Sequence, residues 1–230
     1  MLIGPQNLAP HLTEVRLRIK GAAERAGRDP ASVTLVAVTK TKPVALIRQA
    51  AALGVTDFGE NYLQEAEEKM SALQDLGLTW HFIGAVQSNK TRSIAAAFSW
   101  VHGVDRLKTA QRLAEQRPFH APPLNVCLQV ELVPEQSKGG VSAERLGELA
   151  AQIHHLPRLR LRGLMCIPPA LHDAAAQAAI FDRLAGMLAQ LNARGLKLDT
   201  LSMGMSEDYE IAIGAGATMV RIGTAIFGSR

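Results

Sequence analysis

The sequence predicts an α/β protein that folds as a single (β/α)8 barrel, and three observations support this class. Short apolar runs typical of strands alternate with stretches of helical periodicity, which indicates parallel strands joined by crossover helices. About eight such pairs fit the chain of 230 residues, just under the usual length of this barrel. The clearest strand, at 35–38, is apolar on both faces, as in a parallel sheet covered on both sides.

The main alternative is a doubly wound open sheet. That fold would place a glycine-rich phosphate loop after its first strand, whereas Thr41, Lys42 and Pro43 follow here. No linker or low-complexity tract divides the sequence. We therefore expect residues 1–230 to form one barrel domain with an extra helix before the first strand.

The first half of the chain contains this extra helix and four strand–helix pairs. Leu12, Val15 and Ile19 recur at helical spacing within 8–26, which predicts a helix there. Pro43 suits the first turn of the next helix. The strands and helices that follow are expected at 33–39 and 43–53, 56–59 and 62–73, 80–84 and 91–98, and 100–102 and 105–117.

The second half contains four more strands, each followed by a helical segment. Asp105 and Ser142 are residues that cap helix amino ends, and a pair of prolines after the sixth strand breaks the chain before a long helix. A surface turn over 134–140 holds Lys138. The remaining strands and helices are expected at 124–132 and 142–154, 159–167 and 173–194, 198–203 and 207–215, and 218–222, with a closing segment at 225–228.

The first strand ends in Lys40, at the edge of the barrel where function resides. Side chains alternate along a strand, so Val36, Val38 and Lys40 share one face. In half-apolar surroundings the charged form of an amine is disfavoured, and a neutral amine is a nucleophile that can form a Schiff base. The alternatives are an ordinary exposed lysine, or a special role for Lys42, which is expected on the same face.

The loops after the seventh and eighth strands have the composition of a phosphate site, and barrels of this class commonly hold phosphate there. Gly204 lets the backbone approach a ligand, and Ser206 is suited to cap a helix whose free N–H groups favour an anion. Gly223 and Thr224 add another N–H group and a hydroxyl. The alternative is that both glycines serve tight turns and Ser206 only caps its helix. The two acidic residues after Ser206 would oppose an anion unless they point outward.

Arg221 falls within the apolar eighth strand, on the face of Met219 and Gly223. A buried guanidinium requires a partner. One hypothesis is an ion pair with a barrel carboxylate such as Glu60, and the other is a hydrogen bond to an acceptor nitrogen of a ligand. His81 lies in the middle of a predicted strand, where a satisfied core histidine is the more common interpretation.

Composition argues against several other function classes. The net charge is only +4, and no block of lysine or arginine indicates a nucleic-acid surface. No leader opens the chain and no apolar run approaches the length of a membrane span. Cys127 and Cys166 lie in apolar runs, which predicts buried thiols in a reducing cytoplasm rather than a disulfide or a metal site.

Six motifs extend over nearly the whole chain. They are VAVTKTKP at 36–43, FGENY at 58–62, HFIG at 81–84 with QSNK at 87–90, RGLM at 162–165, SMGMS at 202–206 and VRIGTAIFG at 220–228. In these motifs and their order the sequence resembles the YggS/PROSC-type pyridoxal 5′-phosphate (PLP) homeostasis proteins, related in fold to the amino-terminal barrel of alanine racemase. It departs from the family's usual residues at Ala85-Val86 and, mildly, at Thr39.

The resemblance implies a TIM barrel of the alanine racemase N-terminal type with PLP as its cofactor. It implies that Lys40 carries the Schiff base and that no residue is catalytic. The other implied cofactor-binding residues are Ser206, Gly223 and Thr224 at the phosphate, Arg221 at the pyridine nitrogen, and Asn61 near the ring.

The implied function is PLP homeostasis without evident catalysis. PLP enzymes that form carbanions usually pair the ring nitrogen with a carboxylate, whereas Arg221 would leave that nitrogen unprotonated. Alanine racemase also uses a tyrosine base from a further β-domain, which we do not expect here, and Tyr62 and Tyr209 are the only tyrosines. The expected partners are PLP and apo-enzymes that receive it, with no nucleic acid or membrane, and the expected state is a monomer. The alternatives are a PLP-dependent amino-acid racemase or lyase, and a barrel enzyme that forms a Schiff base with a sugar phosphate.

Overall fold

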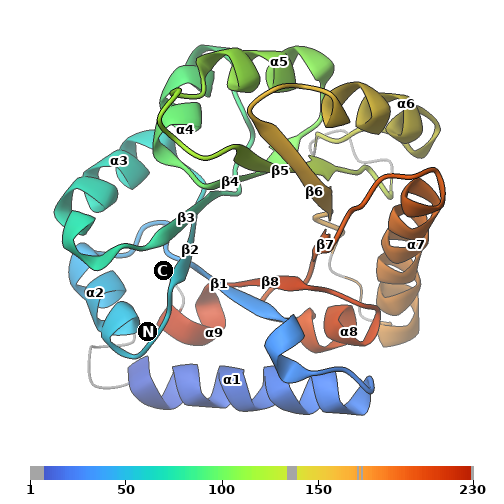
Figure 1. Cartoon of the computed structure of the whole chain (residues 1–230). Helices are drawn as coiled ribbons and strands as arrows, with labels where there is room; N and C mark the ends of the chain where they lie inside the picture. Colours follow the sequence, from blue (N-terminus) through green and yellow to red (C-terminus); the bar gives the residue numbers. More distant parts are fainter. Residues whose placement is uncertain (1–7, 134–138, 170, 172, 229–230) are drawn as a thin grey trace.

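Eight parallel strands close into a barrel in chain order, with β8 hydrogen-bonded to β1 (Figure 1). This structure is a computed structural model, and it describes residues 8–133, 139–169, 171 and 173–228. The barrel prediction is confirmed, and the open-sheet alternative is wrong because the two edges pair. The strands are β1 (Thr34–Val38), β2 (Asp57–Glu60), β3 (Thr79–Phe82), β4 (Trp100–Val104), β5 (Leu124–Gln129), β6 (Leu159–Met165), β7 (Thr200–Ser202) and β8 (Met219–Ile222).

Helices surround the barrel on its outer side (Figure 1). They are α1 (Leu8–Arg25), α2 (Val44–Ala52), α3 (Leu63–Ala72), α4 (Thr91–Ala97), α5 (Leu107–Gln116), α6 (Ala143–His154), α7 (Ala174–Ala193), α8 (Tyr209–Gly214) and α9 (Thr224–Phe227), with 3-10 turns at Pro30–Ser32, Gln74–Leu76 and Ser88–Lys90. The expected extra helix is α1, which packs beside α8 and α9. Arg18 and Arg25 of α1 both donate to the Glu210 carboxylate of α8, at 2.7 and 2.9 Å. Among the described residues no helix has the length and apolarity to cross a membrane.

One expected helix cap is replaced by a longer strand. Asp105 does not cap α5, because β4 continues to Val104 and the helix begins only at Leu107, after Arg106. The Asp105 carboxylate instead accepts a hydrogen bond from Nε of Arg106 at 3.0 Å. Ser142 occupies the N-cap position of α6, as expected, but its side chain makes no capping hydrogen bond. Asp173 caps α7 by accepting from the backbone of the second helical residue.

Apolar side chains form two compartments, one between strands and helices and one inside the barrel. The inner cluster consists of Trp100, Cys127, Met165 and Met219. Cys127 and Cys166 are free and buried, and burial raises the pKa of each thiol to about 12. The prediction of buried thiols is confirmed.

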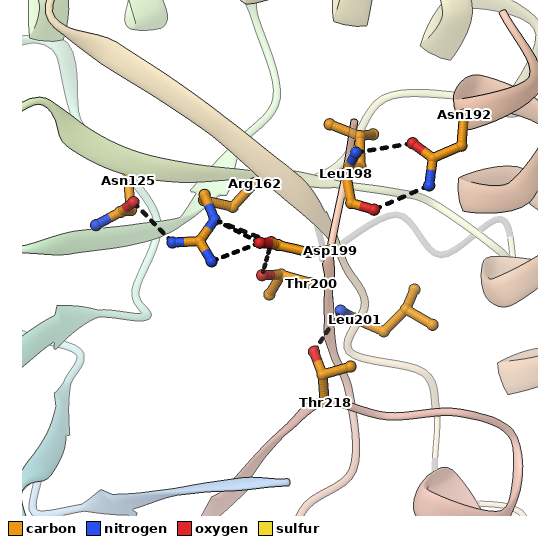
Figure 2. Close-up of polar contacts among 8 residues, drawn as sticks. All are labelled: Asn125, Arg162, Asn192, Leu198, Asp199, Thr200, Leu201 and Thr218. Atoms are coloured by element: carbon orange, nitrogen blue, oxygen red, sulfur yellow. Dashed lines mark hydrogen bonds and ion pairs between the residues drawn. The ribbon is translucent and has the colours of Figure 1, made fainter. Parts of the chain in front are cut away.

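An ionic cluster occupies the amino-terminal end of the barrel (Figure 2). Arg162 of β6 donates from Nε and Nη2 to the Asp199 carboxylate, at 2.9 and 2.7 Å, and from Nη1 to Asn125 at 3.1 Å. Its guanidinium also lies 4.8 Å from the ring centre of Trp100, a cation–π contact. Thr200 donates its hydroxyl to Asp199 at 2.8 Å. The Arg162 motif residue is therefore part of the scaffold at this end.

The strand β7 begins later than expected, at Thr200, because a side chain binds the backbone of Leu198 before it. Asn192 of α7 accepts from the N–H of Leu198 at 2.7 Å and donates to its carbonyl at 2.9 Å (Figure 2). These bonds occupy backbone groups that a strand neighbour would otherwise take. Thr218 then accepts from the N–H of Leu201 at 2.9 Å, which links β7 to the start of β8.

Candidate ligand-binding site

A cavity of about 650 Å³ opens at the carboxyl ends of the strands. It is lined by all six residues that the sequence analysis singles out for a ligand, namely Lys40, Asn61, Ser206, Arg221, Gly223 and Thr224. They come from β8, from the loops after β1, β2, β7 and β8, and, for Thr224, from the first residue of α9. Barrel closure brings these distant segments together, and Val38, Ile83 and Ile167 add apolar walls.

Of the two lysines after β1, Lys40 alone lines the cavity. Lys42 is buried and donates from Nζ to the carbonyls of Phe227 and Gly228, at 3.3 and 3.0 Å. The expectation that both lysines share a face is wrong, because Thr41 has a φ of 63°. A left-handed residue interrupts the alternation of an extended strand. Lys42 therefore holds the carboxyl end of α9 and is directed away from the cavity.

A buried ionic cluster holds the backbone on both sides of Lys40. Lys69 donates from Nζ to the Thr39 carbonyl, to Oε1 of Glu60 and to Oε1 of Glu65, at 2.6, 2.6 and 2.7 Å. The same Glu65 oxygen accepts from the N–H of Thr41 at 2.5 Å. Burial raises the pKa of Glu60, although the hydrogen bonds from Lys69 and Thr39 oppose this rise. The cluster thus stabilises the left-handed turn that presents Lys40 to the cavity.

Arg221 is buried and bound only to neutral acceptors within the described part of the chain. Its Nη1 donates to the carbonyl and to the hydroxyl of Ser202, both at 2.7 Å, and its Nη2 donates to the Cys166 carbonyl at 2.8 Å. The hypothesis of an ion pair with Glu60 is wrong, since Glu60 pairs with Lys69. Burial lowers the pKa of Arg221. A guanidinium has five N–H groups, so donors remain for a ligand in the cavity that Arg221 lines.

Ser206 joins the two loops that were expected to hold phosphate. Its Oγ accepts from the N–H groups of Gly223 and Ala225, both at 3.3 Å. The expectation that Ser206 caps the following helix is wrong, because α8 begins at Tyr209 and Asp208 occupies the cap position. The hydroxyl and the N–H groups thus lie together, and an anion bound beside them would compete with Oγ of Ser206 for these two donors.

The two acidic residues after Ser206 also line the cavity, and do not both point away from it. Glu207 is exposed, whereas Asp208 is half-buried. The Asp208 carboxylate accepts from the N–H of Met205 at 2.6 Å and from the Gln177 amide at 3.0 Å. Burial raises the pKa of Asp208. Local donors therefore bind this carboxylate, which reduces its opposition to an anion.

Two glycines are required by close approach, Gly84 in the cavity lining and Gly204 directly before the lining residue Met205. The sequence analysis gave Gly84 no role. A Cβ on Gly84 would collide with the carbonyl oxygen of Asn61, so this glycine allows the loop after β2 to pack on the loop after β3. Gly204 has a φ of 90°, and a Cβ there would lie 2.7 Å from that of Ala212. Oδ1 of Asn61 is buried and has no partner among the described residues. Asn61 is also one of the residues that line the cavity.

A chain of polar side chains inside the barrel was also missed. His81 contacts Asp57 at 2.9 Å through Nε2 and His102 at 3.0 Å through Nδ1, and His102 contacts Ser202 at 2.7 Å. His81 is thus a satisfied core histidine, as expected, but its partners connect it to the cavity through Arg221. The available signal was a histidine in the middle of each of two consecutive strands.

Two remaining expectations concern other sites. Lys138 lies outside the described residues, as does most of its loop. Within the described ranges no group of three or more histidine, cysteine, aspartate or glutamate side chains is placed to hold a metal ion.

Comparison with known proteins gives consistent similarities over nearly the full length. A family model described as "Alanine racemase, N-terminal domain" matches residues 11–230. The "Pyridoxal phosphate homeostasis protein" of Pseudomonas aeruginosa is 60% identical over 223 residues, covering 97% of this chain and 96% of the relative. The protein of the same name from Escherichia coli K12 is 50% identical over 227 residues, covering 97% of each chain. The solved structure of PipY from Synechococcus elongatus with PLP bound has a TM-score of 0.85 at 39% identity, covering 96% of this chain and all of that one.

Proposed function

We propose, on the premise that this chain belongs to the alanine racemase N-terminal domain family and to its pyridoxal phosphate homeostasis proteins, that it binds PLP reversibly and keeps it available to other proteins. Membership follows from the family match over residues 11–230 and from 60% identity to a homeostasis protein. The function is PLP homeostasis, and PLP is the cofactor. The residue roles, the absence of turnover and the recipients are the parts we add.

One observation carries the proposal: a single cavity presents the amine of Lys40 together with the two donor-bearing loops around Ser206 and Gly223. PLP has an aldehyde and a phosphate at separate positions on its ring, so its site needs an amine and an anion cradle within one space. The residues present fit this requirement. Arg221 and Asn61 line the same cavity, and Oδ1 of Asn61 has no partner among the described residues.

Each residue has a role that its chemistry allows. Lys40 supplies the amine, and the loops of Ser206, Gly223 and Thr224 supply hydroxyl and N–H donors for the phosphate. Arg221 donates to the pyridine nitrogen. When bound, PLP supplies an aldehyde that condenses with a primary amine and releases water, a bond that water or another amine reverses.

We infer that the protein holds PLP without turning over an amino acid. A guanidinium only donates hydrogen bonds, so Arg221 would meet the ring nitrogen as an acceptor and leave it without a proton. That state withdraws electrons weakly, whereas carbanion chemistry needs strong withdrawal. Neither Tyr62 nor Tyr209 lines the cavity, so neither is placed as a second base.

The setting of this function is also part of the proposal. We place the protein in the cytosol, because Cys127 and Cys166 are free thiols of the kind that a reducing compartment preserves. We treat residues 1–230 as one binding domain that acts as a monomer. Its recipients would be apo-enzymes that use PLP.

Borohydride reduction tests the assignment of Lys40. The purified full chain is incubated with PLP, reduced and digested, and peptide mass spectrometry locates the added mass. We expect the mass on Lys40, and its loss together with the yellow colour in Lys40→Ala. The matched control is Lys42→Met, which removes the neighbouring buried amine and should stay labelled. Label on Lys42, or colour that persists in Lys40→Ala, would overturn the assignment.

Solvent deuterium uptake tests the absence of catalysis. The PLP-loaded protein is incubated with alanine and with other amino acids in deuterium oxide, and mass spectrometry follows the exchange at the α-carbon. We expect no exchange at an ordinary enzyme rate. Turnover on the order of 1 s⁻¹ or faster would establish the racemase or lyase alternative instead.

A further inference from the structure

Five polar side chains connect the two ends of the barrel through its interior. Asp57 begins β2, His81 and His102 lie in the middle of β3 and β4, Ser202 ends β7 and Arg221 lies in β8. The successive contacts measure 2.9, 3.0, 2.7 and 2.7 Å. The step from β4 to β7 joins strands that are not neighbours in the sheet, so it crosses the barrel interior.

The middle of this series of hydrogen bonds is buried, whereas the Asp57 side chain is 21% exposed and Arg221 lines the cavity. His81, His102 and Ser202 have fully buried side chains or nearly so, and Arg221 is 4% exposed. The ring of Trp100 stacks on His81, with the centroids 5.5 Å apart and the planes 10° from parallel. Each polar atom in such surroundings needs a protein partner, so the chain members must satisfy one another.

The donors and acceptors that these five side chains offer determine the direction in which each hydrogen bond is donated. Arg221 can only donate, so Ser202 Oγ accepts from it and has its own proton left to donate to Nδ1 of His102. His102 then carries its proton on Nε2 and donates to Nδ1 of His81. His81 in turn carries its proton on Nε2 and donates to the Asp57 carboxylate. Every bond is made once, with both imidazoles neutral.

The charge states agree with this direction. Burial lowers the pKa of His81 and of His102, which keeps both rings neutral at neutral pH. Burial raises the pKa of Asp57, but the hydrogen bonds from His81 and Thr56 outweigh burial and leave it below its ordinary value. Asp57 is therefore ionised and accepts. The opposite direction would require a protonated Asp57 as the first donor.

We propose that Asp57, His81 and His102 are positioning residues that act through Ser202 on Arg221, so that the hold of Arg221 on the ligand depends on a carboxylate at the opposite end of the barrel. In the stated direction the Ser202 oxygen presents its lone pairs to Arg221. If the carboxylate is lost, the direction is no longer imposed. Ser202 can then accept from His102, and its own proton competes for the space beside Arg221. The effect on ligand binding rests on the proposed PLP function, whereas the direction of the chain does not.

The direction of hydrogen-bond donation, from Arg221 through Ser202 and the two histidines to Asp57, is tested on the full-length protein without ligand. Long-range ¹H–¹⁵N correlation spectra report the protonated nitrogen of each histidine, and His81→Gln and His102→Gln identify the two signals. We expect both residues to be neutral with the proton on Nε2, and Asp57→Asn to change at least one of them. A proton on Nδ1 of either ring in the unsubstituted chain, or an unchanged spectrum in Asp57→Asn, would overturn the proposal.

The effect on the ligand is tested with PLP as the probe. Asp57→Asn should weaken PLP binding roughly two- to thirtyfold and shift the absorption maximum of the bound form. The matched control is Asp199→Asn. It removes a carboxylate at the same end of the barrel that has no hydrogen bond to Asp57, His81, His102, Ser202 or Arg221. It should change neither the PLP affinity nor the absorption maximum. Ser202→Ala interrupts the chain next to Arg221. It should reproduce the shift, and the double variant should add nothing further.

The outcomes separate the two proposals. A wild-type chain that does not retain PLP would overturn the proposed function and with it the ligand part of this inference. If the wild type retains PLP and Asp57→Asn behaves like Asp199→Asn, the inference alone is overturned. Additive losses in the double variant would overturn it as well, because they would show that Asp57 and Ser202 act separately.

Discussion

The buried polar groups at the two ends of the barrel differ in the hydrogen-bond partners that they have. At the amino-terminal end, Arg162 donates to Asp199 and Asn125 (Figure 2). Its guanidinium also lies over the ring of Trp100. At the carboxyl end, the buried Arg221 has donors beyond those its protein acceptors use, and Oδ1 of Asn61 has no partner among the described residues. The groups at the amino-terminal end bond to one another within the scaffold, whereas those at the carboxyl end line a cavity that a ligand can enter.

This difference separates scaffold from site. In barrels of this type, residues at the amino-terminal face serve stability and those at the carboxyl face serve function. An unpaired buried polar atom costs free energy, and a ligand in the cavity could give such an atom a partner there. Substitutions at the amino-terminal end should therefore lower stability alone, except at Asp57, which the inferred series of hydrogen bonds connects to Arg221. Substitutions of open groups should lower ligand binding alone.

The largest effect on the free energy of unfolding is expected at Lys69. This residue tests the comparison because it lies at the carboxyl end, yet its amine is bonded to three protein acceptors. In Lys69→Met, the Glu60 carboxylate, which is 0% exposed, loses its cation, and we expect the free energy of unfolding to fall by about 3–5 kcal/mol. Urea unfolding measures this loss. Wild-type-like stability would show that the cluster behind Lys40 is not part of the scaffold.

The pH dependence of Lys69→Met has a definite sign. Burial already raises the pKa of Glu60, and loss of Lys69 raises it further. A carboxyl group with a raised folded-state pKa stabilises the fold while protonated, and this contribution is lost as the pH rises through that pKa. The variant should therefore be closer to wild type at about pH 5 than at about pH 8. In Lys69→Met/Glu60→Gln this difference should disappear.

The next effect is a steric one at the cavity. Gly84→Ala forces a Cβ against the Asn61 carbonyl, and we expect unfolding to become easier by about 1–3 kcal/mol together with weaker PLP binding. Thermal unfolding and PLP titration measure the two changes. The control is Gly186→Ala in α7, where a Cβ meets nothing within 4 Å, and which should be neutral or stabilising by up to about 1 kcal/mol.

A pair of asparagines compares the two ends directly. Asn61→Ala removes an unpartnered acceptor, so we expect the unfolding free energy to stay within about 0.5 kcal/mol while PLP affinity falls about tenfold. Asn192→Ala removes two bonds to the Leu198 backbone, so it should cost about 1 kcal/mol of stability with unchanged affinity. Denaturant unfolding and fluorescence titration of each variant check both readouts. A loss of stability with unchanged affinity in Asn61→Ala, or a loss of affinity with unchanged stability in Asn192→Ala, would contradict the assignment of binding to the carboxyl end and of stability to the amino-terminal end.

The smallest effect is expected at Asp199. Its carboxylate is 56% exposed, and partly exposed ion pairs contribute little, so Asp199→Asn should cost about 0.5 kcal/mol. Burial raises the pKa of Asp199, but the hydrogen bonds from Arg162 and Thr200 leave it below its ordinary value. This contribution is therefore present at neutral pH and is lost as the pH falls through the folded-state pKa. Unfolding at about pH 7 and about pH 3 should show the variant and wild type converging in acid.

Much of this molecule follows from local patterns in the sequence. The alternation of strand and helix signals predicted the closed barrel and the extra helix, because apolar periodicity reports which face of each element is buried. The apolar runs also indicate where the strands end. Lys40, Ser206 and Gly223 follow such ends, so the sequence predicts that they lie at the same edge of the barrel. The motifs predicted the family, which the comparisons confirm.

Other features were decided only by the tertiary structure. The position of Lys42 depends on one backbone dihedral at Thr41, which strand alternation does not report. Ser206 bonds across to the loop of Gly223 rather than capping its own helix, because loop packing overrides local capping preference. The contact of His102 with Ser202 joins residues 100 positions apart. Periodicity is a property of neighbours along the chain, whereas the partners that meet inside a barrel are set by its closure and register.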